Sequence, residues 1–237
     1  IIEVSTFRKQ GEEESSEEDD SNSLLIRRDN TFGSPADDAF RRDFTINALY
    51  YNAADFSIID YVGGREDLQS RLIRAIGDPD IRFQEDPIRI LRGIRLAATL
   101  DFKVEESTWE AMKRQRYCIL ECAVSRIREE VMKILRRDPS HSGFDLLVRA
   151  GILEVVFPKL EEFRLAHIEN KTTGEGPIFQ HLAVLEDLRA KGVELSDPVL
   201  LATLTAAPVR ELLETLPPDD DVGKSLHEYL EANFKPL

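Results

Sequence analysis

Arg41-Arg42-Asp43-Phe44-Thr45-Ile46-Asn47-Ala48-Leu49 combines two cations, a carboxylate and an amide with apolar residues at helical spacing. On a helix, Asp43 and Asn47 would share one face because they are four residues apart. An Arg beside an Asp on a core-packed element suits a site that holds both a polyphosphate and a metal ion. Alone, however, the pattern is more typical of an ordinary Arg–Asp surface pair, and the motifs downstream decide between the two.

The residues around this stretch predict a helix over residues 35–51. Ser34 is a suitable N-cap, and Pro35 fits the first helical position. Asp37 and Asp38 would favour the positive end of the helix dipole. Apolar residues recur every four positions, which predicts one core-facing stripe: Phe40, Phe44 and Ala48.

The composition predicts a globular, cytoplasmic protein. Of the 237 residues, 42% are hydrophobic and 32% are charged, and no apolar run approaches the roughly 18 residues of a membrane span. No signal peptide is visible, so we expect no membrane partner. Cys118 and Cys122 lie four apart in an expected helical stretch, where a reduced pair is a better interpretation than a functional thiol.

The distribution of charge matters more than its sum. A net charge of −14 argues against a nucleic-acid partner, but residues 12–20 alone carry seven of the negative charges in a low-complexity run. We expect these residues to form a solvated loop that projects away from any RNA. Residues 65–137 hold sixteen Lys and Arg against thirteen Asp and Glu, a balance that permits RNA binding without indicating it.

The coarse pattern is a partial α/β unit followed by a helical array, with the boundary near residues 75–85 and no internal repeat. Three segments are expected as strands: residues 1–8, 24–26 and 56–62. A loop containing Gly77-Asp78-Pro79 is expected before residue 87, residues 161–178 are expected as a linker, and Pro208 is expected to end a helix. Further helices are expected over residues 65–72, 87–100, 106–117, 123–136, 143–150, 179–191 and 197–206. Because the chain starts at Ile1 in a strand-like run and ends without a terminal signal, we expect a fragment.

A second candidate site is Glu85-Asp86-Pro87-Ile88-Arg89-Ile90-Leu91-Arg92. With Asp86 as N-cap and Pro87 at the first helical position, Asp86, Arg89 and Arg92 would share one face. A carboxylate beside a guanidinium complements the base edge of adenine or cytosine, whereas guanine and uracil present the opposite order. A capping Asp with an Arg three residues later is the plainer alternative. Core-facing residues of this helix are expected to be Ile90, Leu91, Ile94, Ala97 and Ala98.

A strand-to-helix junction, Asp60-Tyr61-Val62-Gly63-Gly64-Arg65, is a third candidate. Paired glycines permit positive φ and close backbone approach, which suits a hinge or a phosphate. We expect Asp60 to form a salt bridge with a neighbouring Arg that fixes the hinge; a plain turn is the alternative. The sequence has no Walker loop, nucleophile elbow or Cys-x-x-Cys motif. Its four histidines are not spaced like zinc ligands.

Five linked motifs occur in order along the chain. They are residues 2–8 (Ile-Glu-Val-Ser-Thr-Phe-Arg), 28–33 (Arg-Asp-Asn-Thr-Phe-Gly), the 41–49 block, 60–68 (Asp-Tyr-Val-Gly-Gly-Arg-Glu-Asp-Leu) and 85–92. Together they closely resemble the family of class II tRNA nucleotidyltransferases and bacterial poly(A) polymerases, over about residues 1–160. The flanking residues are closer to the bacterial poly(A) polymerase branch.

The resemblance implies an α+β fold: the C-terminal part of a polymerase-β-like nucleotidyltransferase head, followed by an all-α neck and body. The expected domains are a partial head at 1–80, a neck that binds RNA and nucleotide at 81–160, and a truncated body at 161–237. The implied reaction is two-metal nucleotidyl transfer from ATP to an RNA 3′ end, with Mg²⁺ as cofactor and a monomer as the working form.

The resemblance also assigns roles to residues. Asp43 is implied as a catalytic carboxylate and Mg²⁺ ligand, and Arg42 as the residue that holds the triphosphate. The amino-acid template for the base is implied at Asp86 and Arg89. Further nucleotide-binding residues are expected at Asn47 and Arg92, and a flexible hinge is implied at Asp60, Gly63 and Gly64.

One departure bears on activity. The family's Gly-Gly phosphate loop and Asp-x-Asp metal pair precede the Ile-Glu-Val strand with which this chain starts. We therefore expect residues 1–237 alone to incorporate no nucleotide, although the intact protein would be an enzyme. Poly(A) addition to mRNA or tRNA ends is the favoured activity, CCA addition to tRNA is the alternative, and a non-catalytic RNA-binding remnant is the alternative of another class.

Overall fold

The computed structural model describes residues 6–9, 31–137, 139–169 and 176–215. By internal packing the chain divides into two units, Ile1–Cys118 and Ile119–Leu237. The expected acidic loop at 12–20, the strand at 24–26, residues 1–5 of the first strand and residues 28–30 of the second motif lie outside the described residues.

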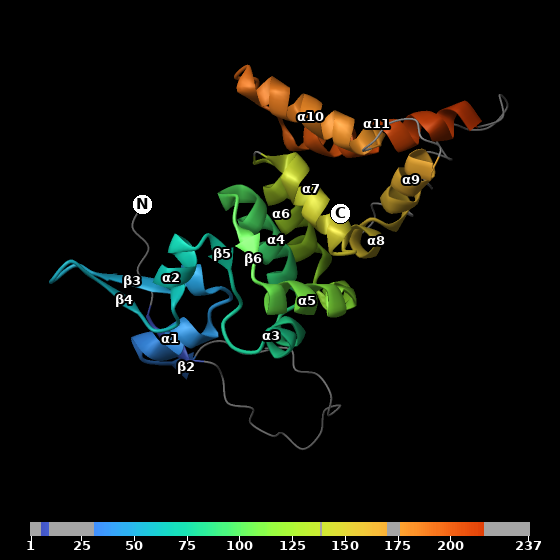
Figure 1. Ribbon diagram of the computed structural model, residues 1–237. Helices are drawn as coiled ribbons and strands as arrows, with labels where there is room; N and C mark the ends of the chain where they lie inside the picture. Colours follow the sequence, from blue (N-terminus) through green and yellow to red (C-terminus); the bar gives the residue numbers. More distant parts are fainter. Residues whose placement is uncertain (1–5, 10–30, 138, 170–175, 216–237) are drawn as a thin grey trace. The chain divides into compact units, whose positions relative to one another are not determined.

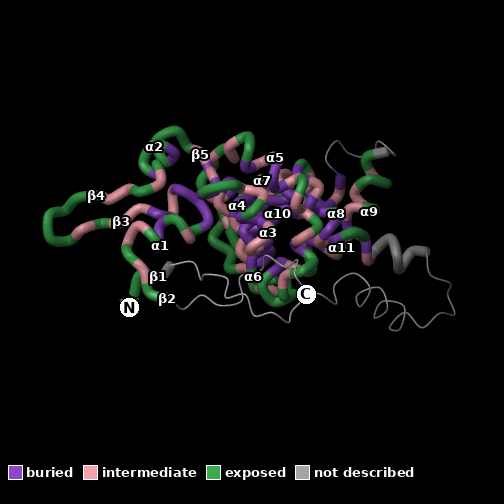
Figure 2. Tube along the Cα trace, turned by 90° about the horizontal axis from the view of Figure 1, so that it is seen from below, coloured by how far each residue is buried: buried purple, intermediate pink, exposed green. Residues whose placement is uncertain are grey.

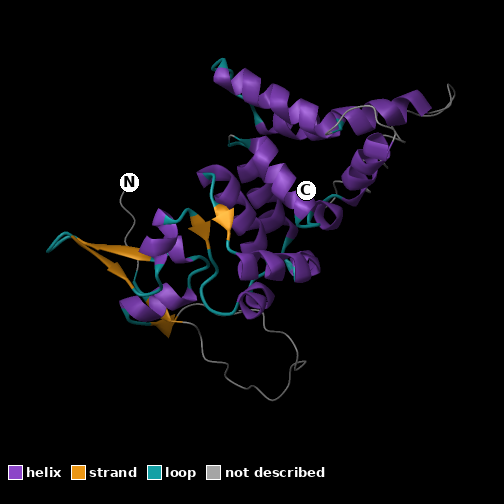
Figure 3. Ribbon diagram, viewed as in Figure 1, coloured by secondary structure: helices purple, strands orange, loops and turns teal. Residues whose placement is uncertain are grey.

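The first half of unit 1 consists of short strands and helices. In chain order these are β1 (Arg8–Lys9), β2 (Thr31–Phe32), α1 (Pro35–Arg41), the 3₁₀ helix η1 (Thr45–Asn47), β3 (Leu49–Asn52), β4 (Ser57–Asp60) and α2 (Gly64–Gln69). β1 pairs antiparallel with β2, and β3 pairs antiparallel with β4. Figure 3 shows β3 and β4 ending in a turn that extends away from α1 and α2, and Figure 2 shows that turn exposed.

The expected helix over 35–51 starts as predicted but is much shorter. Ser34 caps α1, accepting the N–H of Asp37 at 3.2 Å, while Asp37 Oδ2 accepts the Ser34 N–H at 2.8 Å. The helix ends at Arg41 because Arg42 is extended, with φ −67° and ψ 167°. Residues 45–47 then form η1 and residues 49–52 form a strand. The prediction of one continuous helix is therefore wrong beyond Arg41.

The apolar stripe predicted on that helix is wrong for the same reason. Phe44 and Ala48 are fully buried, but Phe40 is 57% exposed. Tertiary hydrogen bonds replace the ladder that would have continued α1: the Thr45 N–H donates to Arg74 O at 3.0 Å, and the Ile76 N–H donates to Asp43 O at 3.1 Å. These bonds pair residues 43–45 with residues 74–76. An isolated antiparallel β-bridge between Phe44 and Ala75 lies at the centre of this pairing.

The second half of unit 1 is mainly helical: β5 (Leu72–Ile73), α3 (Pro79–Glu85), α4 (Ile88–Leu100), β6 (Lys103–Val104) and α5 (Glu106–Arg114). β5 and β6 form a short parallel pair. The helix α3 lies where a loop was expected, capped by Asp78, whose carboxylate accepts the Asp80 N–H at 2.9 Å. Asp86 closes α3 rather than capping α4, and Pro87 takes the N-cap position, so the predicted N-cap is wrong by one residue.

The core of unit 1 lies between α4 and the 41–49 block. The expected inward face of α4 is confirmed, with Ile90, Leu91 and Ile94 fully buried and Ala97 and Ala98 nearly so. Gly93 permits this packing, because a Cβ at that position would lie 2.3 Å from Met112 Cε and 2.8 Å from Phe44 Cζ. Close packing therefore fixes α4 against Phe44.

Unit 2 is all helical in its described part. Its helices are α6 (Val124–Leu135), α7 (Ser140–Arg149), α8 (Leu153–Val156), α9 (Pro158–Glu169), α10 (Pro177–Ala190) and α11 (Asp197–Thr215). α10 packs against α7 and lies beside α11 (Figure 1). The linker prediction is wrong over 161–169, which belong to α9. Pro208 lies inside α11, so the expected break there is wrong.

The cysteines do not lie on the expected α-helix. The 3₁₀ helix η2 (Arg116–Glu121) contains Cys118, Cys122 follows it, and the two do not form a disulfide. The expected α-helix over 106–117 thus ends at Arg114. None of the helices in the described residues is long and apolar enough to cross a membrane. The predicted succession of a mixed α/β part and a helical array is confirmed.

Candidate functional site

The carboxylate of Asp43 is buried at the centre of the candidate site, with the residue only 7% exposed. Its Oδ1 accepts the Phe44 N–H at 2.9 Å and Asn47 Nδ2 at 3.3 Å. The predicted proximity of Asp43 and Asn47 is therefore found, although a turn and not an α-helix produces it. Asp43 Oδ2 lies 2.8 Å from Arg92 Nη2.

The ion pair between Asp43 and Arg92 leaves one hydrogen-bond acceptor and one donor without an aligned hydrogen bond. Asp43 Oδ2 and Arg92 Nε are both buried and have no aligned hydrogen bond. Since a buried carboxylate oxygen normally has a hydrogen-bond partner, Oδ2 keeps coordinating capacity beyond its ion pair with Arg92. Arg92 was expected on the same helix face as Asp86 and Arg89, and its side chain contacts Asp43.

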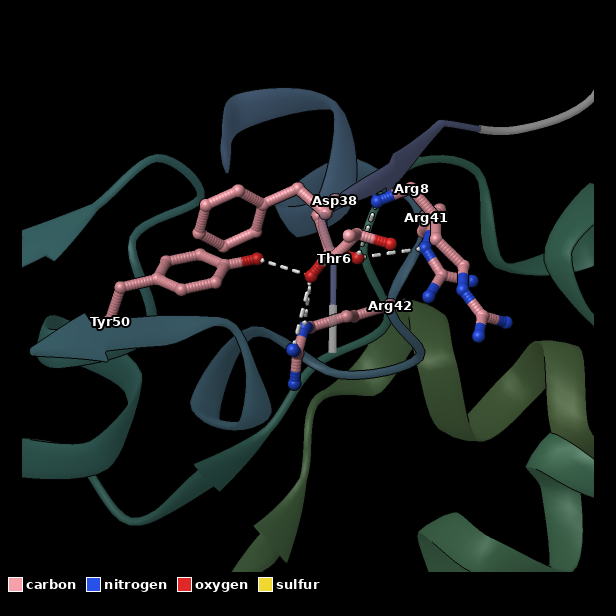
Figure 4. A pocket seen from close by; sticks show the side chains of 7 residues that line it. Thr6, Arg8, Asp38, Arg41, Arg42 and Tyr50 are labelled. Atoms are coloured by element: carbon pink, nitrogen blue, oxygen red, sulfur yellow. Dashed lines mark hydrogen bonds and ion pairs between the residues drawn. The ribbon is translucent and has the colours of Figure 1, made fainter. Parts of the chain in front are cut away.

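Arg42 lies in a cluster organised by Asp38. Asp38 Oδ2 accepts Arg42 Nη2 at 3.0 Å and the Tyr50 hydroxyl at 2.8 Å, and Oδ1 accepts Arg41 Nε at 2.9 Å (Figure 4). The Arg42 guanidinium also lies over the Tyr50 ring, 5.4 Å from its centroid, and Nη1 donates to Asn47 O at 2.9 Å. The Arg42 side chain remains 43% exposed, so its cation is accessible.

The Asp38 cluster lines a shallow pocket of about 350 Å³, shared with Thr6, Phe7 and Arg8 (Figure 4). Burial raises the pKa of Asp38, but hydrogen bonds from Tyr50, Arg41, the Arg8 N–H and Arg42 outweigh it and lower the pKa to about 2. Asp38 is therefore a permanent anion at neutral pH. It orients the cations that border the pocket.

A buried arginine, Arg82, holds the end of α1. Its Nη2 donates to Arg41 O at 2.6 Å and to Arg42 O at 2.7 Å, and its Nη1 donates to Glu85 Oε2 at 2.5 Å. Burial and the nearby positive charge of Arg89 both lower the pKa of Arg82, and Glu85 opposes them. These contacts explain why α1 stops, because Arg82 takes the carbonyls that the next helical turn would use.

Asp86 and Arg89, the residues expected to form the base template, differ in their burial. Arg89 is 7% exposed, and its Nη1 donates to Arg82 O at 3.0 Å and to Glu85 Oε2 at 3.1 Å. Asp86 is half-buried, and its backbone carbonyl accepts the Arg89 N–H at 3.1 Å. Arg89 is thus held by Glu85 and by backbone carbonyls.

Asp60 organises the predicted hinge in an unpredicted way. Oδ1 accepts the N–H groups of Val62, Gly63 and Gly64 at 2.9–3.1 Å, and Oδ2 accepts the Arg65 N–H at 2.9 Å. The expected salt bridge to an Arg side chain is wrong; backbone donors at the start of α2 take its place. Burial raises the pKa of Asp60, but these four backbone hydrogen bonds lower it by more, so the pKa lies below its usual value.

Gly63 and Gly64 serve different purposes. Gly63 has φ +80°, which favours glycine. A Cβ on Gly64 would lie 2.1 Å from Thr45 O, so this glycine is needed for close approach to η1. Thr45 is held from the same side, its hydroxyl donating to Asp67 Oδ2 at 2.7 Å. Gly64 therefore abuts η1, the element that follows Asp43.

Sequence reasoning missed Asp38, Tyr50, Arg82 and Glu85. Arg82, Glu85 and Arg89 are spaced three and four apart, which is the spacing of neighbours on a helix face, but the expected loop before residue 87 concealed it. Arg41 and Arg42 lie three and four residues after Asp38, which is also the spacing of neighbours on a helix face. Tyr50 and Arg8 lie 12 and 30 residues from Asp38 in the sequence, so no local pattern marked them as its partners.

Asp43 fits part of a magnesium site. A buried carboxylate oxygen without a hydrogen bond is a suitable hard ligand for Mg²⁺. Among the residues described here, however, no group of three His, Cys, Asp or Glu side chains is close enough together to hold a metal ion. The described part of the chain thus offers one carboxylate and no complete ligand set.

Comparison with protein families identifies two matching models. Residues 1–74 match the poly A polymerase head domain. Residues 101–164 match a region described as the probable RNA and SrmB-binding site of polymerase A. The 41–49 and 60–68 motifs fall in the first match, and α5, α6 and α7 fall in the second.

Among curated proteins, poly(A) polymerase I of Salmonella typhi is 41% identical over 166 residues, covering 69% of this chain and 36% of that protein. The CCA-adding enzyme of Bacillus pumilus is 34% identical over 165 residues, covering 69% and 38%. This chain therefore spans little more than a third of the length of these two relatives.

A solved CCA-adding enzyme in its apo form II aligns with 98% of this chain and 57% of its own, with a TM-score of 0.58 and 23% identity. At that identity the likeness concerns the fold. Together with the head-domain match, it confirms the expected α+β head followed by helical regions. The division into domains at 80 and 160 stays a prediction.

Proposed function

The chain belongs to the family of class II tRNA nucleotidyltransferases and bacterial poly(A) polymerases, and from this we propose that its protein adds AMP from ATP to RNA 3′ ends. The observation that carries the proposal is the Arg42–Asp43 pair, held by tertiary contacts on the turn after α1. It places an accessible cation beside a buried carboxylate whose Oδ2 is ion-paired with Arg92 but has no aligned hydrogen bond. Such a pair suits a triphosphate accompanied by a metal ion.

Asp43 would hold Mg²⁺ through Oδ2, together with carboxylates that the described residues do not supply. When bound, the metal would neutralise charge on the triphosphate and increase the nucleophilicity of the RNA 3′-hydroxyl. Arg42 would bind the triphosphate, since its guanidinium is exposed and oriented by Asp38. Asn47 would orient the Asp43 carboxylate through the 3.3 Å contact with Oδ1.

Asp86 and Arg89 would read the base edge, and Arg92, paired with Asp43, would lie between this template and the metal ligand. An adenine or cytosine edge complements that pair. Asp60, Gly63 and Gly64 would form the hinge. We propose a monomer that acts on an RNA 3′ end.

Poly(A) addition is the favoured activity because poly(A) polymerase I is the more similar relative, with 41% identity against 34% for a CCA-adding enzyme over nearly the same length. The test uses the intact gene product that contains this chain. It would be offered ATP and CTP with a generic RNA or with a tRNA that ends in CC. Repeated AMP addition to the generic RNA is expected; CTP incorporation, or a halt after a single A, would establish CCA addition instead.

Replacing the metal-ligand candidate tests the site itself. Asp43→Asn keeps the shape of the side chain but removes the charge, so we expect AMP incorporation by the intact protein to fall at least about 100-fold. The matched control is Asp101→Asn at the exposed C-cap of α4, where Asn accepts the left-handed conformation of φ 54°. Equal activity of the wild type and the Asp43→Asn variant would exclude Asp43 from the reaction.

A further inference from the structure

Arg82 occupies an unusual position for an arginine. It is 6% exposed, and its two terminal nitrogens contact three acceptors on two different segments. One nitrogen holds the carbonyls of Arg41 and Arg42, and the other holds the carboxylate of Glu85. Its Nε is buried without a hydrogen bond, so the side chain leaves one donor unpaired while holding these acceptors.

The same carboxylate links Arg82 to Arg89. Glu85 Oε2 accepts Nη1 of both arginines, at 2.5 Å from Arg82 and 3.1 Å from Arg89. Arg89 also donates to Arg82 O at 3.0 Å and lies 3.5 Å from Arg41 O. One connected group of charges therefore joins the turn that carries Arg42 and Asp43 to the residue assigned to the base edge.

We propose that Arg82 is a positioning residue that fixes the phosphate-binding turn relative to Arg89 and thereby contributes to nucleotide selectivity. The inference rests on the proposed function, because selectivity presupposes that Arg89 reads a base. Arg82 itself is not a catalytic residue. It acts by holding the Arg41 and Arg42 carbonyls and by sharing Glu85 with Arg89.

The geometry explains why an arginine is needed. A planar guanidinium can address carbonyls on one side and a carboxylate on the other, whereas a lysine ammonium is a single point. Without the guanidinium, the two carbonyls lose their buried donor, and Glu85 loses the contact that links it and Arg89 to Arg82. Arg89 would then adopt a wider range of positions relative to the turn.

The test compares Arg82→Lys and Arg82→Gln in the intact protein with a matched control, Arg164→Gln. Arg164 also pairs with a Glu three residues away and is similarly buried, with 11% of its side chain exposed against 7% for Arg82. It lies in α9, in the other unit. Arg164→Gln controls for the general cost of breaking a buried Arg–Glu pair, and Arg82→Lys retains the charge if Arg82→Gln fails to fold.

The first readout is hydrogen exchange of the Thr45 and Ile76 amides in the nucleotide-free protein, which needs no activity. We expect at least about tenfold faster exchange in the Arg82 variants and no change in Arg164→Gln. The second readout is the ratio of kcat/KM for ATP to that for GTP. A displacement of the template by about 1 Å should lower this ratio about 10- to 100-fold in Arg82→Lys, even if the Tm of that variant is close to the Tm of the wild type.

The outcomes separate this inference from the proposed function. If the wild type shows no nucleotide incorporation and no ATP binding, the proposed function fails and the selectivity role fails with it. If the wild type is active but the Arg82 variants keep both the exchange rates and the ATP/GTP ratio, the positioning role alone is wrong. Equal loss of kcat for both nucleotides, with an unchanged ratio, would also overturn it.

Discussion

Asp38 and Asp43 are five residues apart, and their environments give them opposite properties. Asp38 accepts hydrogen bonds from Arg8, Arg41, Arg42 and Tyr50, which leave no obvious site for a ligand. Asp43 has one carboxylate oxygen that lacks an aligned hydrogen bond. The first carboxylate is suited to organising cations, and the second is suited to binding one.

This difference predicts a pH dependence of stability. The folded-state pKa of Asp38 is about 2, below the 3.8 of an unperturbed Asp, so its stabilising contribution is complete above about pH 4 and is lost as the pH falls towards 2. Asp38→Asn should therefore lower the free energy of unfolding by about 2 kcal/mol at pH 7. Urea unfolding of both proteins at pH 7 and pH 3 measures this difference in the free energy of unfolding.

The difference in the free energy of unfolding between the wild type and Asp38→Asn should be smaller at the lower pH, because the wild-type carboxylate begins to be protonated there. Asp101→Asn is a suitable control, since Asp101 is an exposed residue at the C-cap of α4. A difference in the free energy of unfolding that stays constant from pH 7 to pH 2 would contradict the lowered pKa of Asp38.

At the scale of elements, α2 and η1 meet through backbone at Gly64. Because the nearest atoms to a Cβ there are the carbonyl oxygen and carbon of Thr45, at 2.1 and 2.7 Å, a side chain cannot be accommodated by a rotamer change. The whole of α2 or η1 would have to move. Thr45 in turn follows Asp43 by two residues, so this contact supports the candidate site.

We expect Gly64→Ala to lower the free energy of unfolding by about 3 kcal/mol through this overlap. Gly63→Ala is the matched comparison: no atom lies within 4 Å of its Cβ, and only the φ of +80° costs about 1 kcal/mol. Chemical denaturation of both variants measures the difference. Equal destabilisation would mean that backbone conformation, and not contact with Thr45, requires the second glycine.

At the scale of the whole molecule, the net charge of −14 is opposed to an RNA partner unless the charges are segregated. The seven acidic residues at 12–20 account for half of that net charge. Deleting them would leave −7. At physiological salt the Debye length is about 8 Å, so charges that project from the RNA path should contribute little.

We therefore expect deletion of residues 12–20 from the intact protein to change RNA affinity less than about twofold at 0.15 M salt. A second variant keeps the length and replaces the seven acids with Gln and Asn, which separates charge from chain length. Filter binding or fluorescence anisotropy gives the dissociation constants. A gain of tenfold in both variants would show that the acidic run lies beside the RNA.

Local chemistry was enough to predict several features of this protein from its sequence. The cap at Ser34, the inward face of α4 and the mixed fold followed by helices depend on short-range spacing and solvation, which a sequence displays directly. The family followed from five motifs in order. The candidate residues Asp43 and Asn47 were also placed in contact, although on the wrong element.

Only the tertiary structure decided where α1 ends and which residues support the site. Arg82 takes the Arg41 and Arg42 carbonyls from 40 residues or more along the chain, and residues 74–76 pair with 43–45. Such partners cannot be recognised from spacing, because buried backbone groups accept any donor that the fold brings within reach. For the same reason, the ion pair between Arg92 and Asp43 was not predicted from the sequence.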